Sequence, residues 1–225
     1  MCTSIVSNRE KTIVGWNLDI LGMEHRVSVY GAGVFIEIND ALEGWMPLFG
    51  VNARGDFVGM PTCWPYDSRS DGAENNIINL DIDLLLMKTT FEETLEKVKK
   101  NKISSVDGLT FMSQISNRGG DVLQVIPGQG YTFSKKPKYK VLTNFSPFKQ
   151  DSEKHDWMGF DRYEKAIGVL ENAGEDFGVK DCFSLLSEVS QTVCPTVVSM
   201  VYDAEENKVY WCENREYGNI KSKEL

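Results

Sequence analysis

The segment "MCTSIVSNREKTIVGWNLDI" (residues 1–20) places two apolar runs on either side of a polar turn. Cys2 to Val6 and Thr12 to Trp16 are the runs, and "SNREK" (Ser7 to Lys11) separates them. Two apolar runs around a short polar turn predict a β-hairpin. Such a hairpin would bring Asp19, which follows the second run, back beside Cys2 at the start of the first.

Similar runs recur along the chain, mostly in pairs joined by polar turns. Residues 50–60, "GVNARGDFVGM", have strand-like ends around a turn, and "SNRGGD" (residues 116–121) separates another pair. Strands in hairpins, rather than strands alternating with helices, favour antiparallel sheets. The other runs expected to form strands are residues 34–38, 111–115, 122–126, 139–143, 197–202 and 208–212.

Three segments carry helical spacing. Thr90 and Glu93 form a capping-box pattern ahead of an apolar stripe that reaches Val98. Residues 160–170 carry a second apolar stripe, and residues 182–189 carry a third with Asp181 as its candidate cap. Because these helices lie between strand groups, each can cover an outer sheet face. We therefore expect a layered α+β domain that spans residues 1–225.

The composition is that of a globular domain with an acidic balance. The chain has 225 residues, of which 41% are hydrophobic and 25% charged, and its formal net charge is −9. Acidic balance argues against nucleic-acid binding, which needs a basic face. No apolar run approaches the roughly 18 residues of a membrane span, and "SNREK" interrupts the place of a signal-peptide core. The expected location is cytoplasmic, without a membrane partner.

The cysteines are scattered and odd in number, so neither a disulfide framework nor a metal cluster is expected. Histidine-based chemistry has only His25 and His155 available. No dinucleotide-binding fingerprint is present either, so the sequence predicts no cofactor. The five cysteines are Cys2, Cys63, Cys182, Cys194 and Cys212.

Cys2 follows Met1 directly, and this position allows two interpretations. If Met1 is removed, the new α-amine lies beside the thiol of the same residue, and its reference pKa of about 7.7–8.0 lets it act as a base near neutral pH. One residue would then supply both nucleophile and base. The alternative is that Cys2 is a small buried hydrophobe in the first strand.

Several motifs, in this order, resemble the N-terminal-nucleophile hydrolases of the choloylglycine hydrolase group. That group includes bile salt hydrolases and penicillin V acylases and, more distantly, acid ceramidase and isopenicillin N acyltransferase. "MCTSIV" resembles the family's start at cysteine, and "GWNLD" (Gly15 to Asp19) resembles its G-R-N-x-D motif. The other similar segments are "GVNARGDFVGM", "SNRGGDVLQV", "VLTNFSPF" (141–148), "DRYEKAIGVL" (161–170) and "PTVVSMVYDAEENKVYW" (195–211).

The resemblance implies a four-layer αββα sandwich and a set of catalytic residues. It implies Cys2 as nucleophile, Asp19 as its positioning acid and Asn144 as an oxyanion or amide-orienting donor. Arg162 matches an active-site arginine more loosely. Other interpretations remain open, since Asn144 could cap a turn before Pro147 and Arg162 could pair with acids on its helix.

Five residues are candidates for substrate binding. Trp16 stands where bile salt hydrolases have arginine, and Asn17 follows it in the same motif. Thr62 or Cys63 aligns with a family asparagine, and Trp64 is placed to line or cover a pocket, or to be plain core. Without the arginine, thiol activation would rest on another cation or differ. The acyltransferase branch also lacks that arginine, which favours that branch.

We therefore expect a single-domain, cofactor-independent amidase that cleaves a linear amide of a small N-acylated substrate through an acyl-enzyme. Acyl transfer to a second amine is a close variant. The alternative from another class is a non-catalytic ligand-binding protein of the same fold that keeps Met1. The resemblance also suggests a homo-oligomer.

Overall fold

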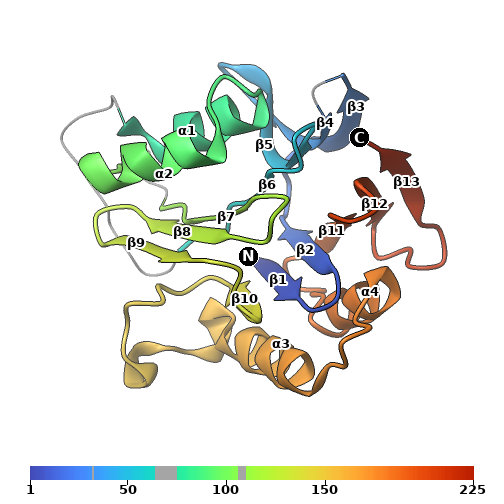
Figure 1. Ribbon diagram of the computed structural model, residues 1–225. Coiled ribbons are helices and arrows are strands. Elements are labelled where there is room, and N and C mark those ends of the chain that lie inside the picture. Colours follow the sequence, from blue (N-terminus) through green and yellow to red (C-terminus); the bar gives the residue numbers. More distant parts are fainter. Residues whose placement is uncertain (32, 64–74, 106–109) are drawn as a thin grey trace.

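A computed structural model describes residues 1–31, 33–63, 75–105 and 110–225 (Figure 1). These residues form two antiparallel sheets stacked between two pairs of helices, so the predicted four-layer α+β sandwich is confirmed. One sheet has the strand order β10-β1-β2-β11-β12-β13. Its strands are β1 (Cys2–Asn8), β2 (Thr12–Asp19), β10 (Tyr139–Leu142), β11 (Thr196–Asp203), β12 (Lys208–Glu213) and β13 (Lys221–Glu224).

The second sheet has seven strands in sequential order, from β3 to β9. Its strands are β3 (His25–Tyr30), β4 (Gly33–Asp40), β5 (Gly44–Asn52), β6 (Phe57–Gly59), β7 (Ser113–Ser116), β8 (Val122–Ile126) and β9 (Gly130–Ser134). Neighbouring strands pair in the hairpin fashion that the sequence predicts, for example across residues 50–60 and 113–126.

The β1–β2 hairpin forms in the predicted place. Cys2 pairs with Leu18 and Asn8 with Thr12, so the start of β1 lies beside the end of β2. β11 pairs with the other side of β2, and Thr196 lies opposite Asp19. The start of β1, the end of β2 and the start of β11 therefore meet at one edge of the six-stranded sheet.

Helices cover the outer face of each sheet (Figure 1). α1 contacts β5 and β6 of the seven-stranded sheet, and α2 packs beside α1. On the opposite side, α3 contacts β1 and β10, and α4 contacts β2 and β11. The helices are α1 (Ile77–Leu85), α2 (Phe91–Lys100), α3 (Phe160–Asn172) and α4 (Val179–Glu188), with two 3₁₀ turns, η2 (Asp151–Glu153) and η3 (Asp156–Met158).

The expected helix caps were partly right. Thr90 caps α2, and Thr90 and Glu93 form the predicted reciprocal capping box. Asp181 is not the cap of α4, because the helix begins three residues earlier than that assignment requires. The cap is Gly178, and the Asp181 carboxylate accepts the Gly178 N–H from within the first turn.

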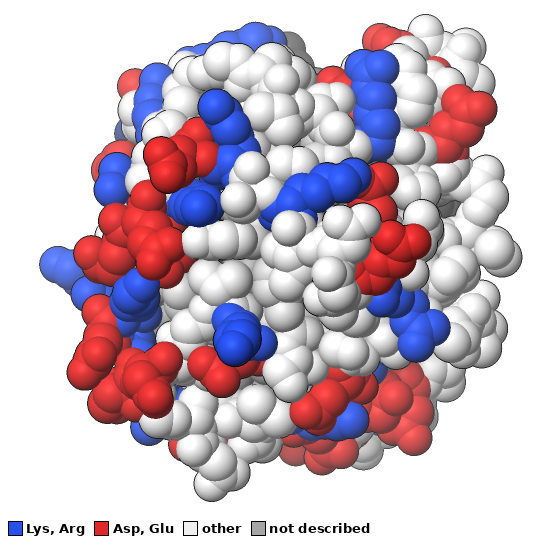
Figure 2. Space-filling model, turned by 90° about the vertical axis from the view of Figure 1, so that its right-hand side faces the viewer, with Lys and Arg blue, Asp and Glu red and all other residues white. Residues whose placement is uncertain are grey.

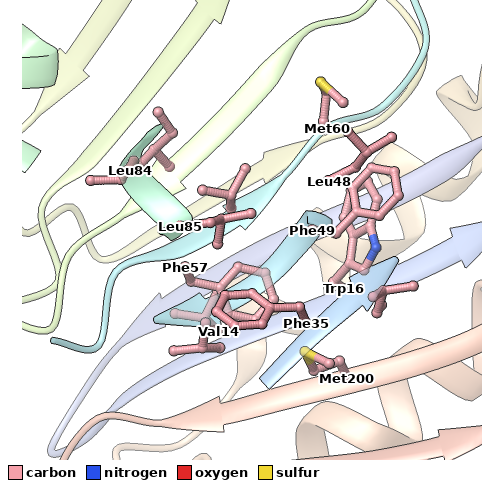
Figure 3. Packing of buried hydrophobic residues seen from close by; sticks show 14 of the residues in the cluster. Val14, Trp16, Phe35, Leu48, Phe49, Phe57, Met60, Leu84, Leu85 and Met200 are labelled. Atoms are coloured by element: carbon pink, nitrogen blue, oxygen red, sulfur yellow. The ribbon is translucent and has the colours of Figure 1, made fainter. Parts of the chain in front are cut away.

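The main core lies between the two sheets (Figure 3). Trp16 is fully buried there and stacks on Phe49 with ring centroids 5.3 Å apart. Fully burying a large apolar side chain contributes about 1.5–3 kcal/mol, so this interface accounts for much of the driving force for folding. A smaller core joins the six-stranded sheet to α3 and α4 and includes Ile5, Val201 and Leu186.

Lysine, arginine and acidic side chains are interspersed over the face shown in Figure 2. Within the described part of the chain, no helix is long and apolar enough to cross a membrane.

Candidate active site

Cys2 begins β1 at the edge where three strand ends meet. The residue is only 4% exposed. Burial raises the pKa of the Cys2 thiol to about 11, although the neighbouring terminal ammonium and Arg162 oppose this shift. With Met1 in place, the thiol is therefore protonated near neutral pH, and the nucleophilic thiolate is scarce.

Asn144 joins the loop after β10 to the backbone of Cys2. Its Oδ1 accepts the Cys2 N–H at 2.8 Å and an Arg162 N–H at 2.8 Å, while its Nδ2 donates to the Thr62 carbonyl at 2.6 Å. Because two donors converge on one atom, that atom is the amide oxygen and the orientation of the amide is fixed. The side chain therefore holds the nitrogen that becomes the α-amine if Met1 is lost.

Arg162 projects from the first turn of α3 into the same cluster. One guanidinium nitrogen donates to the Cys2 carbonyl at 2.8 Å and to Thr3 Oγ1 at 2.7 Å, and it lies 3.6 Å from the Asp19 carboxylate. The side chain is only 7% exposed. A buried guanidinium is stable only when its donors are satisfied and its charge is paired, and these contacts meet both needs.

Gly159, between η3 and α3, makes room for that guanidinium. Its φ of +80° is in the left-handed region, and a Cβ built there would lie 2.3 Å from an Arg162 nitrogen. Both the backbone conformation and the close approach require glycine. The entry to α3 therefore fits the arginine into the site.

Asp19 ends β2 and is fully buried. Its carboxylate accepts hydrogen bonds from Thr196 Oγ1 at 2.6 Å and Gln191 Nε2 at 2.5 Å. Burial raises its pKa to about 6, against the opposing effects of Arg162 and these two donors. The carboxylate is thus ionised at neutral pH, when it pairs with Arg162, and becomes protonated in mild acid.

The structure brings Cys2, Asn144 and Arg162 into one hydrogen-bonded cluster, which Asp19 joins through its ion pair with Arg162 and the Thr62 carbonyl through Asn144.

The other candidates lie elsewhere. Asn17 is fully buried toward α4, where it donates to the Leu186 carbonyl and accepts from Ser199. Trp16 lies in the core between the sheets, and its indole N–H has no partner among the described residues. Cys63 is buried with Met112, and Trp64 lies outside the described residues.

Three supporting residues were not found from the sequence. Thr3 contacts Arg162 because alternate residues of β1 face opposite sides of the sheet, so the residue after Cys2 faces α3. Gln191 reaches Asp19 from the turn before β11, and Thr196 reaches it as the first residue of β11. β11 and β2 are far apart in the sequence, so no local motif predicts that they pair. Within the described residues, no group of three or more potential ligands could hold a metal ion.

Two antiparallel sheets stacked between helical layers are also the fold of solved structures that resemble this chain. No protein-family model matches the chain, and no curated protein matches it in sequence. Solved structures do match.

Two matches are variants of the conjugated bile acid hydrolase from Clostridium perfringens. The cysteine-to-alanine variant has a TM-score of 0.68 at 13% identity, and the match covers 100% of this chain and 92% of that one. The arginine-to-leucine variant has a TM-score of 0.69 at 14% identity, with 99% and 92% covered. Penicillin V acylase from Agrobacterium tumefaciens matches with a TM-score of 0.63 at 14% identity, over 95% and 83% of the two chains. These likenesses establish the fold.

Proposed function

We propose that this protein, once Met1 is removed, is an amide hydrolase of the N-terminal-nucleophile type with Cys2 as nucleophile. One observation carries the proposal. The Cys2 nitrogen is held by Asn144 Oδ1 at 2.8 Å, and Arg162 binds both that oxygen and the Cys2 carbonyl. The backbone nitrogen and the carbonyl oxygen of Cys2 are thus both held by hydrogen bonds. A residue whose own amine must act as the base needs such orientation.

The proposed reaction has two halves. The Cys2 sulfur forms a bond to the amide carbonyl carbon, and the carbon–nitrogen bond breaks. The thiol proton passes through the α-amine of Cys2 to the leaving nitrogen, which departs as an amine. Water then attacks the thioester carbon, the carbon–sulfur bond breaks, the hydroxyl of the water stays with the acyl group as a carboxylic acid, and its other proton returns to the sulfur of Cys2.

Asn144 supports the first half in two ways. Its Oδ1 orients the amine, and its Nδ2 carries a second N–H beside the one that donates to Thr62. We assign that second N–H to the oxyanion that forms on the substrate carbonyl, where a well-placed donor is worth about 3–4 kcal/mol in the transition state.

The state of the thiol explains why loss of Met1 matters. While Met1 is attached, the Cys2 nitrogen is an amide without basicity, and burial holds the pKa of the thiol at about 11. Removal of Met1 creates an amine with a reference pKa of about 8 next to the sulfur. We therefore expect the chain that keeps Met1 to be inactive.

The substrate class is a linear amide of a small N-acylated molecule. The similar structures are of a conjugated bile acid hydrolase and a penicillin V acylase, and this class covers both names. Acyl transfer would use the same acyl-enzyme, with an amine in place of water.

The test is intact mass spectrometry before and after brief treatment with iodoacetamide, on the unaltered chain and on Cys2→Ala. We expect loss of Met1 and one fast alkylation that Cys2→Ala abolishes. Cys212→Ala is the matched control, because Cys212 is also buried and free but packs in the core beneath the helices. It should leave the fast alkylation unchanged.

Release of amine from a panel of N-acylated amides is the second readout. Turnover that Cys2→Ala abolishes and Cys212→Ala retains supports a hydrolase. Retention of Met1 together with a slow Cys2 thiol would overturn the mechanism and leave a ligand-binding protein on a hydrolase fold.

A further inference from the structure

The amine of Met1 lies in a defined binding site beside Cys2. Its nitrogen donates to the Asp19 carbonyl at 2.8 Å and lies 3.8 Å from Cys194 Sγ. Since Met1 would lie opposite Asp19 in the register of β1 and β2, this contact extends the hairpin ladder by one hydrogen bond. Met1 itself is half-buried.

After Met1 is removed, no amine would contact the Asp19 carbonyl and Cys194 Sγ. Asp19 is fully buried, so its carbonyl would lose its partner in a place where water is scarce. Buried backbone acceptors are almost always paired. Cys194 Sγ, a weaker acceptor, would lie beside that carbonyl. A donor group from the substrate would restore the lost bond.

The surroundings favour a charged donor. Burial acts to lower the pKa of the Met1 ammonium, attraction to Cys2, Cys194 and Asp19 acts to raise it, and the net effect is a raised pKa. Because the Cys2 thiol is protonated near neutral pH, the formal negative charge near the ammonium at that pH is the Asp19 carboxylate, which also pairs with Arg162 at 3.6 Å. The Asp19 carbonyl and Cys194 Sγ both accept from the amine, so this site favours an ammonium.

The site of the Met1 amine lies at a suitable number of bonds from the carbonyl carbon that would react. In Met1 the ammonium nitrogen is two bonds from the carbonyl carbon that is attached to Cys2. In an α-aminoacyl amide, the free ammonium is likewise two bonds from the carbonyl carbon that the thiol would attack. A substrate of this kind could therefore place its carbonyl near Cys2 and its ammonium where the Met1 amine lies.

We propose that the Asp19 carbonyl and Cys194 Sγ form an ammonium subsite, and that the acyl half of the substrate carries a free α-amino group. This inference rests on the proposed amide hydrolysis and narrows its substrates to aminoacyl amides, whose products are an amino acid and an amine. Cys194 then acts as a specificity-determining residue, on the same segment whose Gln191 and Thr196 bind the Asp19 carboxylate.

The first test compares methionyl and N-acetylmethionyl amides of 7-amino-4-methylcoumarin as substrates of the protein whose Met1 is shown by mass to be absent. We expect kcat/KM to favour the free amine by about tenfold or more, since a charge-assisted hydrogen bond is lost on acetylation. Cys194→Val should reduce that preference by about threefold, because sulfur is a weak acceptor. Val193→Ala is the matched control, since the Val193 side chain is 86% exposed in the same turn, and it should keep the preference.

The second test does not depend on turnover. Titration calorimetry on Met1-free Cys2→Ala protein should show tighter binding of methioninamide than of N-acetylmethioninamide. Equal binding, or tighter binding of the acetylated compound, overturns the subsite. If the acetylated coumarin amide is cleaved at least as fast as the free amine, the subsite is wrong while the proposed hydrolase function stands. If binding favours the free amine but neither compound is cleaved and Cys2 alkylates slowly, the subsite stands and the hydrolase function fails.

Discussion

A single guanidinium, that of Arg162, contacts three of the groups on which the proposed chemistry depends. It donates to the Cys2 carbonyl and to Asn144 Oδ1, and it faces the Asp19 carboxylate. Its planar fork suits several acceptors at fixed angles, whereas the ammonium of lysine is a point charge. The geometry of the amine and thiol therefore depends on the shape of this side chain as well as on its charge.

We expect Arg162→Lys to reduce kcat/KM by about tenfold or more, because one ammonium cannot hold Cys2, Thr3 and Asn144 together. Unfolding in urea should show a loss of about 1–3 kcal/mol from the missing hydrogen bonds. Arg26→Lys is a suitable control, because Arg26 pairs with Glu37 and is half exposed on β3. Unchanged activity in Arg162→Lys would show that charge alone suffices.

Asp19 gives the site a predicted pH dependence. Burial raises its pKa to about 6, so the carboxylate gains a proton as the pH falls through 6 and loses its charge pairing with Arg162. We expect kcat/KM to fall on the acid side in two steps, first as the Cys2 amine gains a proton near its reference pKa of about 8 and again with a midpoint near pH 6 as Asp19 does. In Asp19→Asn the activity should be low, and the step near pH 6 should be absent while the step of the amine remains. A step near pH 6 that persists in the variant would assign that titration to another group.

The same pKa has the opposite effect on stability. The folded state binds this proton more tightly than the unfolded chain does, so the contribution of Asp19 to the free energy of unfolding is greatest in acid and is lost as the pH rises through about 6. The ionised form that supports the proposed activity is thus the less stable one. Buried charge is retained here at a cost to stability, as is common in active sites.

Among the elements, those with a clear local pattern were predicted, and several without one were not. The capping box of α2 and the hairpin around residues 7–11 are encoded within a few residues. By contrast, β13 has the sequence Lys-Ser-Lys-Glu, and all four residues are exposed. It therefore forms only because its backbone pairs with that of β12. β3 and β9 are edge strands of the second sheet with exposed side chains, which obscured their alternation.

α1 was missed for a different reason. Its sequence, "IINLDIDLL", is mostly apolar, and Asp81, one of its three polar residues, is fully buried. A short run with so few polar positions does not distinguish a buried helix from a strand. The site shows the same division. Cys2 and Asp19 follow from one hairpin, whereas Gln191 and Cys194 arrive through the pairing of β11 with β2.

Two glycines, Gly159 at the entry to α3 and Gly168 within that helix, provide a matched test. Gly159→Ala should displace Arg162, because the new Cβ would lie 2.3 Å from its guanidinium and the backbone has a positive φ. We expect a loss of about 1–3 kcal/mol in stability and a large loss of activity. Gly168→Ala, within the same helix and facing open space, should instead raise stability by about 0.5–1 kcal/mol. Equal effects of the two changes would contradict the role given to Gly159.

At the scale of the molecule, polar side chains join the two sheets within their shared core. Gln114 on β7 donates to Ser4 Oγ on β1 at 2.9 Å, and it accepts from Gln124 at 2.7 Å. All three side chains are buried. Buried polar groups that lose a partner are expensive, so the chain of bonds favours one relative position of the sheets. It lies next to Cys2 on the same strand and therefore also fixes the site.

This linkage leads us to expect that residues 1–225 unfold as one cooperative unit. Tryptophan fluorescence, to which Trp16 in the core between the sheets contributes, should follow the same urea transition as far-ultraviolet circular dichroism.

Gln114→Leu should lower the free energy of unfolding by about 1–3 kcal/mol, because Ser4 and Gln124 each lose a partner. Ser4→Ala combined with Gln114→Leu should cost less than the sum of the two single changes, since the double variant no longer buries an unpaired Ser4 hydroxyl. Two separate transitions, or strictly additive effects, would mean that the sheets are stabilised independently, and the position of Cys2 would then not depend on the opposing sheet.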